Sequence, residues 1–462
     1  MVVSGNRFVQ LRCVRMRVPA TICAAMAFAF AIPAATVAQV MPMPAKQSDV
    51  CKSDDDDDDD KPVPLWKRFA WEGACFDVSG QLSAVYQKQK NSGSRIPILT
   101  TRQGGLTNAS ELVTFDASVR VDTTRKTSLG DLTTGFEVQY EKTTVDSGNG
   151  IATLIEGIVT LAGFKGGYTD SQMNFWSGDF QFSAAAPQRT VGLAGYEFKL
   201  NDAWTFTLAY ETGLPTSQAG QSDFVTVYPK DPVASAKLYY EKDDAEFQLA
   251  GMVHDLHIDG SHPRLAAFGR SQSFDAFGWA TTAGLTLPVK WGADGSAFSM
   301  QATYAVNASP YLGTVADLST LAGLVGVPVT TKGWSIVGSY HHVFSDHWEA
   351  NAMASYLALD IAMDRQSPSI RTNRYAANLI YKPDDKLKLG AEVGYVRADI
   401  DSGGPLGLLG LGLFNPVFFN DLLGGSIASA VNANLPLPGV NTGPRGVKGN
   451  GLAGYLFATW SF

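Results

Sequence analysis

The stretch LVTFDASVRVDT, residues 112–123, decides the fold. Apolar side chains occupy every second position from Val113 to Val121, and polar or charged side chains fill the positions between them. Successive side chains of a β-strand point to opposite faces, so this strand has one apolar and one ionic face. The same alternation recurs in residues 132–141, 203–211, 245–254, 373–382 and 386–395. The pattern predicts an all-β protein whose strands separate an apolar from an aqueous environment.

The connections between these segments are of two kinds. Short polar turns, at 201–202, 242–244, 345–347 and 382–385, alternate with long linkers near 214–231, 256–275, 309–331, 361–372 and 400–448. This asymmetry is typical of an outer-membrane barrel, which has short periplasmic turns and long outer loops. We therefore predict a transmembrane antiparallel β-barrel of about 16 strands, each about ten residues long, with both chain ends in the periplasm.

Aromatic residues of the apolar face give a second indication of a barrel. Tyr140, Trp204, Tyr240, Trp348 and Tyr395 are among those that fall near the predicted strand ends. Indole and phenol rings favour the headgroup level of a membrane. A two-sheet core would instead collect its aromatic side chains at mid-strand. We interpret these residues as two aromatic girdles.

Composition and charge exclude other classes of protein. The chain has 462 residues, 17% of them charged, and its 36 basic and 44 acidic residues give a net charge of −8. No basic tail or stripe is present, so a nucleic-acid partner is not expected. Only residues 18–38 form an apolar run long enough to cross a bilayer as a helix, which excludes a helical multi-span protein.

The N-terminal residues 1–38 are predicted to be a signal peptide. Four arginines precede the apolar run, and Thr36 and Ala38 have the small-residue spacing of a cleavage site. Translation from Met1 or from Met16 is compatible with this signal. Cleavage after Ala38 would remove the four arginines and leave 32 basic and 44 acidic residues, a net charge of −12.

Residues 39–74 are predicted to be a periplasmic segment before the barrel, which would occupy residues 75–462. After cleavage only Cys51 and Cys75 remain, and an even pair in an oxidising compartment suggests one disulfide. The loop between them carries seven consecutive aspartates, Asp54 to Asp60. Either a solvated charged loop or a weak calcium or magnesium site fits this run. We predict no dedicated metal site.

No constellation of catalytic residues is apparent. The six histidines lie at or near predicted loops and turns, and no nucleophile elbow, phosphate-binding loop or dinucleotide fingerprint occurs. Ser339 and His341 alternate to one face, but that face is the predicted lumen rather than the lipid-proximal surface. We therefore expect neither an enzyme nor a cofactor.

Three segments carry a resemblance to a known family. The last nine residues, GYLFATWSF, place Trp460 and Phe462 on the outward face and resemble the terminal strand that the barrel-assembly machinery recognises. CFDVSGQLSAVY, from Cys75, and GIVTLAGFKGGYTDSQMNFW, residues 157–176, resemble the general porins of alphaproteobacteria, of the rhizobial type. The segment between the two cysteines departs from that family, in which it is usually aromatic and glycine-rich.

The resemblance implies a homotrimer of water-filled barrels through which small hydrophilic solutes and ions diffuse passively. Outer-membrane lipid, lipopolysaccharide and the assembly machinery are the other implied partners. The third long loop, about residues 177–189, would fold inward and narrow the pore, with Asp179 as its only acid and Arg189 as its only base. The predicted lumen charges on the wall are Arg120, Asp116, Glu137, Lys237 and Glu392.

A transverse field between Asp179 and Arg120 would then set the ion preference, whose sign the sequence leaves open. Two alternatives remain. A substrate-selective channel would use the same architecture. A structural or adhesive barrel would bind partners through its outer loops, among which residues 406–425 are unusually apolar.

Overall fold

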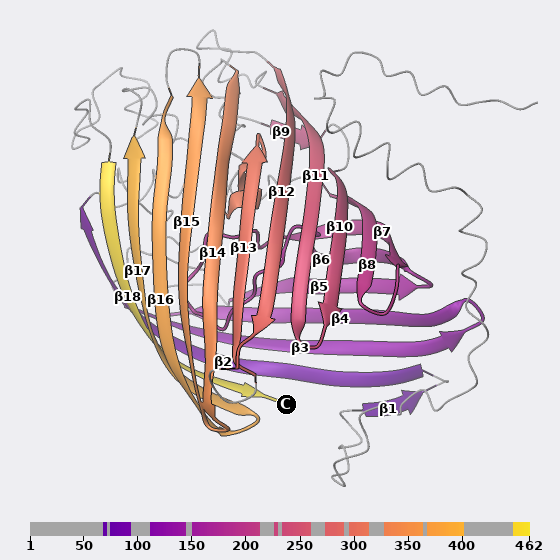
Figure 1. Ribbon diagram of the computed structural model, residues 1–462. Helices are drawn as coiled ribbons and strands as arrows, with labels where there is room; N and C mark the ends of the chain where they lie inside the picture. Colours follow the sequence, from indigo (N-terminus) through magenta and orange to yellow (C-terminus); the bar gives the residue numbers. More distant parts are fainter. Residues whose placement is uncertain are drawn as a thin grey trace, which may run out of the picture.

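The computed structural model describes residues 68–71, 74–93, 111–144, 150–212, 226–229, 233–259, 273–290, 295–313, 328–363, 367–401 and 447–462. It is built almost entirely of antiparallel strands (Figure 1). The strands of the wall are β2 (Ala74–Gly93), β3 (Glu111–Thr127), β4 (Gly130–Thr143), β5 (Ile151–Leu161), β6 (Phe164–Asp170), β7 (Thr190–Lys199), β8 (Trp204–Glu211), β10 (Val233–Lys242), β11 (Ala245–Asp259), β12 (Phe274–Pro288), β13 (Ala297–Val306), β14 (Val329–Ser345), β15 (Trp348–Met363), β16 (Ser369–Asp384), β17 (Leu387–Asp401) and β18 (Val447–Ser461).

The sheet closes on itself. Each strand pairs with its neighbour in the chain, and β18 pairs with β2 from Gly449↔Gly93 to Ser461↔Gln81. Of the 18 strands in the sheet, β9 (Thr226–Pro229) pairs with β11 beyond the end of β10, and β1 (Arg68–Trp71) pairs only with β2. Removing these two from the count leaves a closed barrel of sixteen strands. The predicted fold class is confirmed.

Alternation along each strand sorts side chains between lipid and lumen. On β3, Phe115 and Val119 are 52% and 48% exposed on the outer surface, whereas Thr114, one residue away, is 2% exposed. A one-residue shift would move every apolar side chain into the lumen, so the pattern fixes the register wherever lipid contacts the outer face.

Aromatic pairs mark both ends of the lipid-facing surface. Near the short turns, Trp204 packs against Tyr240 with ring centroids 4.9 Å apart, and Trp348 packs against Tyr381 at 4.8 Å, both pairs in a tilted arrangement. Towards the long loops, the rings of Trp334 and Tyr356 lie 5.0 Å apart, and those of Tyr375 and Tyr395 lie 6.4 Å apart. Because each pair bridges adjacent strands, the rings form bands around the barrel at the levels where a bilayer has its headgroups.

The strands are longer than the sequence pattern indicates. β14, β15 and β16 have 17, 16 and 16 residues, and the linkers predicted at 256–275 and 361–372 are partly strand. The expected length of about ten residues is therefore wrong for this side of the barrel. Beyond the lipid both faces of a strand contact water, so the hydrogen-bonded ladder continues although the alternation fades. No helix in the described residues is long and apolar enough to span a membrane.

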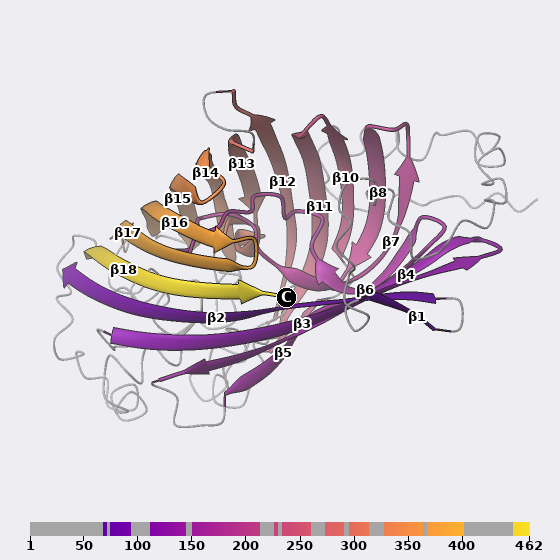
Figure 2. The same ribbon diagram turned by 90° about the horizontal axis from the view of Figure 1, so that it is seen from below.

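The C-terminus and β1, the first described strand, both pair with β2 (Figure 2). Phe462 closes the last ladder bond by donating its N–H to Gly80 O at 3.0 Å, and β1 pairs with β2 from Ala74 to Asp77, beyond that point. Cys75 is disulfide-bonded, and its predicted partner Cys51 lies outside the described residues, as do the predicted signal peptide and the aspartate run.

Candidate functional site

Residues 171–189, between β6 and β7, form a loop inside the barrel rather than above it; we call it the inward loop. Its aromatic residues Trp176, Phe180 and Phe182 are 5%, 3% and 2% exposed. Burying these rings against the barrel wall removes large apolar surfaces from water, which stabilises the inward position. This is the third outer loop, and its inward fold is the one that the family resemblance implies.

A buried glutamate holds the start of the inward loop. Glu211 on β8, 1% exposed, accepts hydrogen bonds from Ser171 Oγ at 2.8 Å and from the Gln172 N–H at 2.9 Å. The two limbs are tied together where they leave the wall, because Asn174 Nδ2 donates to Arg189 O at 2.9 Å and its Oδ1 accepts from the Arg189 N–H at 3.1 Å.

Amide and hydroxyl side chains fix the middle of the loop. Gln301 on β13 donates to Met173 O at 2.8 Å and accepts from the Trp176 N–H at 2.9 Å. The Trp176 indole N–H donates to Ser339 Oγ on β14, also at 2.9 Å. Backbone groups of an irregular segment must find partners when they are buried, and here the wall supplies them.

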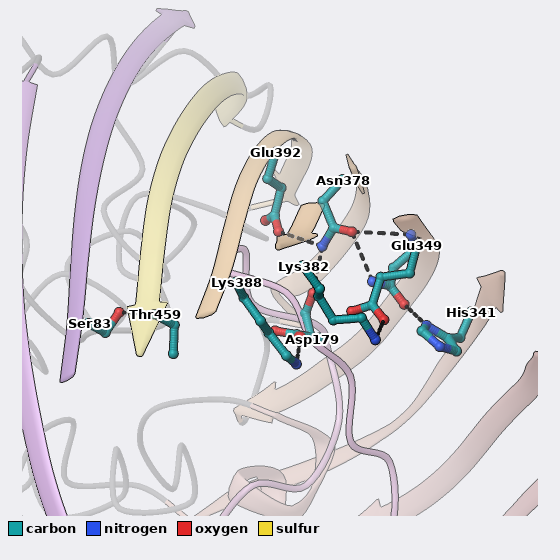
Figure 3. A network of polar contacts seen from close by, with 10 residues as sticks. Ser83, Asp179, His341, Glu349, Asn378, Lys382, Lys388, Glu392 and Thr459 are labelled. Carbon is teal, nitrogen blue, oxygen red and sulfur yellow. Dashed lines mark hydrogen bonds and ion pairs between the residues drawn. The ribbon is translucent and has the colours of Figure 1, made fainter. Parts of the chain in front are cut away.

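The tip of the loop is held by a second buried glutamate. Glu392 on β17 accepts from the Gln181 N–H at 2.9 Å and from the Phe182 N–H at 2.6 Å. Asn378 on β16 donates to Asp179 O at 2.5 Å and to Glu392 Oε2 at 3.2 Å (Figure 3). The Asp179 carboxylate pairs with Lys388 Nζ at 2.7 Å.

The returning limb contacts β15, β16 and the 3-10 turn η3 (Ser309–Leu312). Arg374, buried on β16, donates to Ser183 Oγ at 2.7 Å, and the Ala185 N–H donates to Ser355 Oγ at 3.1 Å. The Arg189 guanidinium lies 5.1 Å from the centre of the Tyr311 ring. The inward loop therefore makes contacts across the inner face of the barrel, from Glu211 on β8 to Glu392 on β17.

An open passage remains between the loop and the opposite wall. A cavity of about 900 Å³ lies there, bounded on one side by loop residues 177–181. Across from them it is lined by polar side chains of β2, β3 and β4: Gln81, Ser83, Gln87, Asp116, Gln139 and Glu141. Such a polar lining keeps the passage filled with water and gives a dissolved solute hydrogen-bonding groups along its path.

Charges around the passage are unequal. Its lining holds three carboxylates, Asp116, Glu141 and Asp179, and one ammonium group, that of Lys388. Next to it, Arg120 is paired with Asp122 at 2.7 Å.

The same guanidinium contacts two more carboxylates, Glu156 at 2.6 Å and Glu137 at 3.5 Å. Three acids thus compensate the one arginine. The described lining of the passage thus carries more carboxylates than cationic groups, and charges at a narrow polar constriction act through little screening water.

The residues predicted for the lumen have different surroundings. Asp116 and Asp179 line the passage, whereas Arg120 and Glu137 belong to the ion-paired cluster next to it. Asp179 pairs with Lys388, and Arg120 pairs with three carboxylates. The expected field between Asp179 and Arg120 is therefore modified by these four other charged groups.

The other three predicted residues lie elsewhere on the lumen side. Glu392 is 5% exposed and anchors the loop tip rather than standing free in the lumen. Arg189 is the last residue of the inward loop, and its N–H donates to Asn174 Oδ1. Lys237 stands 5.7 Å from the Tyr239 ring on β10, and the described lining of the passage does not contain it.

Sequence reasoning missed Lys388, Asn378, Arg374 and Glu211. Alternation places all four on the lumen face, and that was the only signal available. Their partners in the inward loop are 39 to 209 residues away in the chain, so only the closed barrel identifies the contacts. In the part of the chain that the structure describes, no group of three or more His, Cys, Asp or Glu side chains could hold a metal ion.

Comparison with known proteins gives a family match. The model of the porin subfamily matches residues 75–406. No curated protein sequence matches the chain.

The chain is similar to solved structures of outer-membrane proteins. The outer membrane channel DcaP of Acinetobacter baumannii is similar with a TM-score of 0.58 and 14% identity, over 84% of this chain and 98% of that one. OmpT of Vibrio cholerae has a TM-score of 0.44 and 12% identity, over 86% of this chain and 100% of that one. OprB of Pseudomonas putida has a TM-score of 0.45 and 10% identity, over 84% of this chain and 94% of that one. At 14% identity, the likeness to DcaP concerns the fold alone.

Proposed function

This chain belongs to the porin subfamily, and we propose that its inward loop and acidic wall make it a passive diffusion channel that favours small hydrophilic cations. The protein is a porin of the bacterial outer membrane, and its barrel carries small solutes without an energy source. The observation that carries the preference is the lining of the passage, in which three carboxylates stand against one lysine.

The preference follows from the position of the charges. Arg120 is surrounded by three carboxylates and Asp179 is paired with Lys388, and the lining of the passage carries Asp116 and Glu141 in addition. A cation that passes between these residues is attracted throughout the constriction, whereas an anion is repelled. The passage of neutral solutes would be limited by their size, since they carry no charge that the wall could attract or repel.

Reconstitution into a planar lipid bilayer tests both parts of the proposal. We expect stepwise, ohmic conductance, and under a salt gradient a reversal potential of the sign that indicates cation preference. A silent bilayer would contradict channel function and would favour the structural or adhesive barrel. Conductance with a reversal potential of the opposite sign would contradict the preference only. A single solute that blocks the current at low concentration would indicate a substrate-selective channel.

A homotrimer is part of the proposal. β6 and β8 have only seven and eight residues, so they rise about 23–26 Å along the strand and about 16–21 Å across the membrane at the tilt of a barrel. That is short of the apolar band of about 25 Å. Phe164, Tyr196 and Tyr210 are 52%, 43% and 63% exposed on this side of the barrel. A second copy would cover both the short wall and these rings.

We further propose that the protein is not an enzyme and needs no cofactor for transport. The polar groups inside the barrel are used to hold the inward loop: Glu211 and Glu392 bind backbone N–H groups, and Ser339 accepts from an indole. Assembly is proposed to depend on the barrel-assembly machinery through the terminal Trp460 and Phe462.

A further inference from the structure

A histidine lines the passage beside the inward loop. The imidazole of His341 on β14 is half-buried and belongs to the lining, together with Ser339 and Asn351 of the same wall. The other histidines whose side chains the structure describes, His254, His257, His342 and His347, are not part of that lining. His341 therefore stands where a dissolved ion passes, and neither the anchoring of the loop tip nor the count of carboxylates accounts for it.

A chain of hydrogen bonds connects His341 to the anchor of the inward loop (Figure 3). His341 Nδ1 lies 2.7 Å from Asn351 Oδ1, and Asn351 Nδ2 donates to Asn378 Oδ1 at 2.9 Å. Asn378 Nδ2 in turn donates to Asp179 O and to the Glu392 carboxylate. These contacts join β14, β15 and β16 to the tip of the loop.

The far end of this chain determines which nitrogen of the imidazole carries a hydrogen. A carbonyl oxygen and a carboxylate accept, so Asn378 must turn its NH₂ group towards them and its Oδ1 towards Asn351. The backbone N–H of Asn351 donates to the same Oδ1 at 3.1 Å. Asn351 then presents its own Oδ1 to His341, and Nδ1 of the ring must be the donor.

The other ring nitrogen, Nε2, is the one that can take up a proton. It has no hydrogen-bond partner in the part of the chain that the structure describes, and it is open to the passage. A protonated imidazole donates from both nitrogens, so the bond from Nδ1 to Asn351 remains when Nε2 is protonated. A positive charge can therefore appear in the passage without breaking the chain that leads to the loop tip.

The charged groups on the same side of the passage are held in ion pairs (Figure 3). Glu349 on β15 pairs with Lys382 on β16 at 2.6 Å. Asp179 of the inward loop pairs with Lys388 on β17 at 2.7 Å. Each pair combines one acid with one base, so an imidazolium at position 341 would add a charge that neither pair cancels.

The remaining neighbours of the imidazole differ between the two sides. β13, which pairs with β14 here, contributes Ala297 and Ser299 to the lining, and neither of them titrates. Asp116 and Glu141 line the opposite wall. Carboxyl groups ordinarily titrate near about pH 4 and ammonium groups above about pH 10, so the interval between about pH 5 and pH 8 is that of an imidazole.

We propose that His341 makes the ion preference of the channel dependent on pH. This inference rests on the proposed channel and refines its preference for cations. With a neutral imidazole, three carboxylates stand against one ammonium group in the lining, and protonation of His341 adds a second cationic group. In acidic water, cations are then attracted less and anions are repelled less.

The size of the change follows from Coulomb's law. At a distance of about 10 Å in water, a unit charge changes the Boltzmann weight of a monovalent ion about 2-fold, in opposite directions for a cation and an anion. The ratio of cation to anion permeability should therefore fall about 2- to 4-fold between about pH 8 and about pH 5.5, the smaller value allowing for screening by salt.

Reversal potentials in a planar bilayer, measured under a salt gradient at these two pH values, test the proposal. His341→Gln is the test variant, because its amide can still donate to Asn351 Oδ1 but cannot take up a proton. His342→Gln is the matched control, since His342 faces outward on the same strand and contacts the Tyr340 hydroxyl at 2.9 Å. His341→Lys, which carries a permanent charge, should show the lower ratio already at about pH 8.

We expect the full change with pH in the natural protein and in His342→Gln, and less than about 1.3-fold in His341→Gln. An undiminished change in His341→Gln, or its loss in both single variants, would overturn the proposal. A change that persists in His341→Gln together with brief current steps would instead assign the pH dependence to Glu392 and the loop tip.

The same recordings separate this inference from the proposed function. An anion preference at about pH 8 would contradict the proposed cation preference, while the change with pH would still decide the role of His341. A silent bilayer would contradict both.

Discussion

Glu392→Gln is the substitution that most directly tests the anchoring of the inward loop. The carboxylate accepts three N–H groups, those of Gln181, Phe182 and the Asn378 side chain. A glutamine has the same shape but only one acceptor oxygen, and its NH₂ group would then face at least one N–H donor.

The size of the effect follows from these contacts. A hydrogen bond to a charged group contributes about 1.5–3 kcal/mol, and a buried donor without a partner costs about 1–3 kcal/mol. Removing the buried charge returns part of its desolvation cost, so we take the loss at the lower end, about 2 kcal/mol. At 1.4 kcal/mol per factor of ten, displacement of the loop tip should become about 30-fold more frequent.

Single-channel recording in a planar bilayer measures that displacement as brief steps in current. We expect more frequent steps in Glu392→Gln, with the barrel still folded because the β16–β17–β18 ladders do not use this side chain. Val393→Thr, on the same strand but facing lipid at 50% exposure, is the matched control and should record as the natural protein does. A quiet current in Glu392→Gln, equal to that of the control, would refute the anchoring role.

Three further expectations concern selectivity, assembly and the disulfide. Arg120→Gln leaves three carboxylates uncompensated and should raise the cation preference, whereas Asp179→Asn leaves its lysine partner uncompensated and should shift the preference towards anions. Reversal potentials under a salt gradient measure both, and unchanged values would place the constriction elsewhere. Deleting Phe462 removes the last ladder bonds and should lower the amount of assembled barrel without altering the conductance of those that form, which immunoblotting of unheated samples measures. Mass spectrometry without reduction should find Cys51 linked to Cys75, and two free thiols would exclude the link.

The sequence by itself determined which way each strand faces. The alternation in residues 112–123 and the short turns near 201–202 and 382–385 predicted a barrel and its periplasmic end, because a period of two and a tight turn are local properties of a few residues. The local pattern failed to predict strand length beyond the lipid. There both faces of a strand contact water, so the hydrophobic alternation no longer shows where the strand ends.

Only the tertiary structure decided what the lumen residues do. Glu392 was predicted as a free lumen charge, yet it binds the backbone of a loop 210 residues earlier in the chain, and Asp179 meets Lys388 across 209 residues. Arg120 was expected to form a transverse field with Asp179, but it pairs with three carboxylates, because β3, β4 and β5 bring Asp122, Glu137 and Glu156 to one point. Alternation gives the face of a side chain, but closure of the barrel brings distant side chains within hydrogen-bonding range, and no local pattern in the chain encodes that closure.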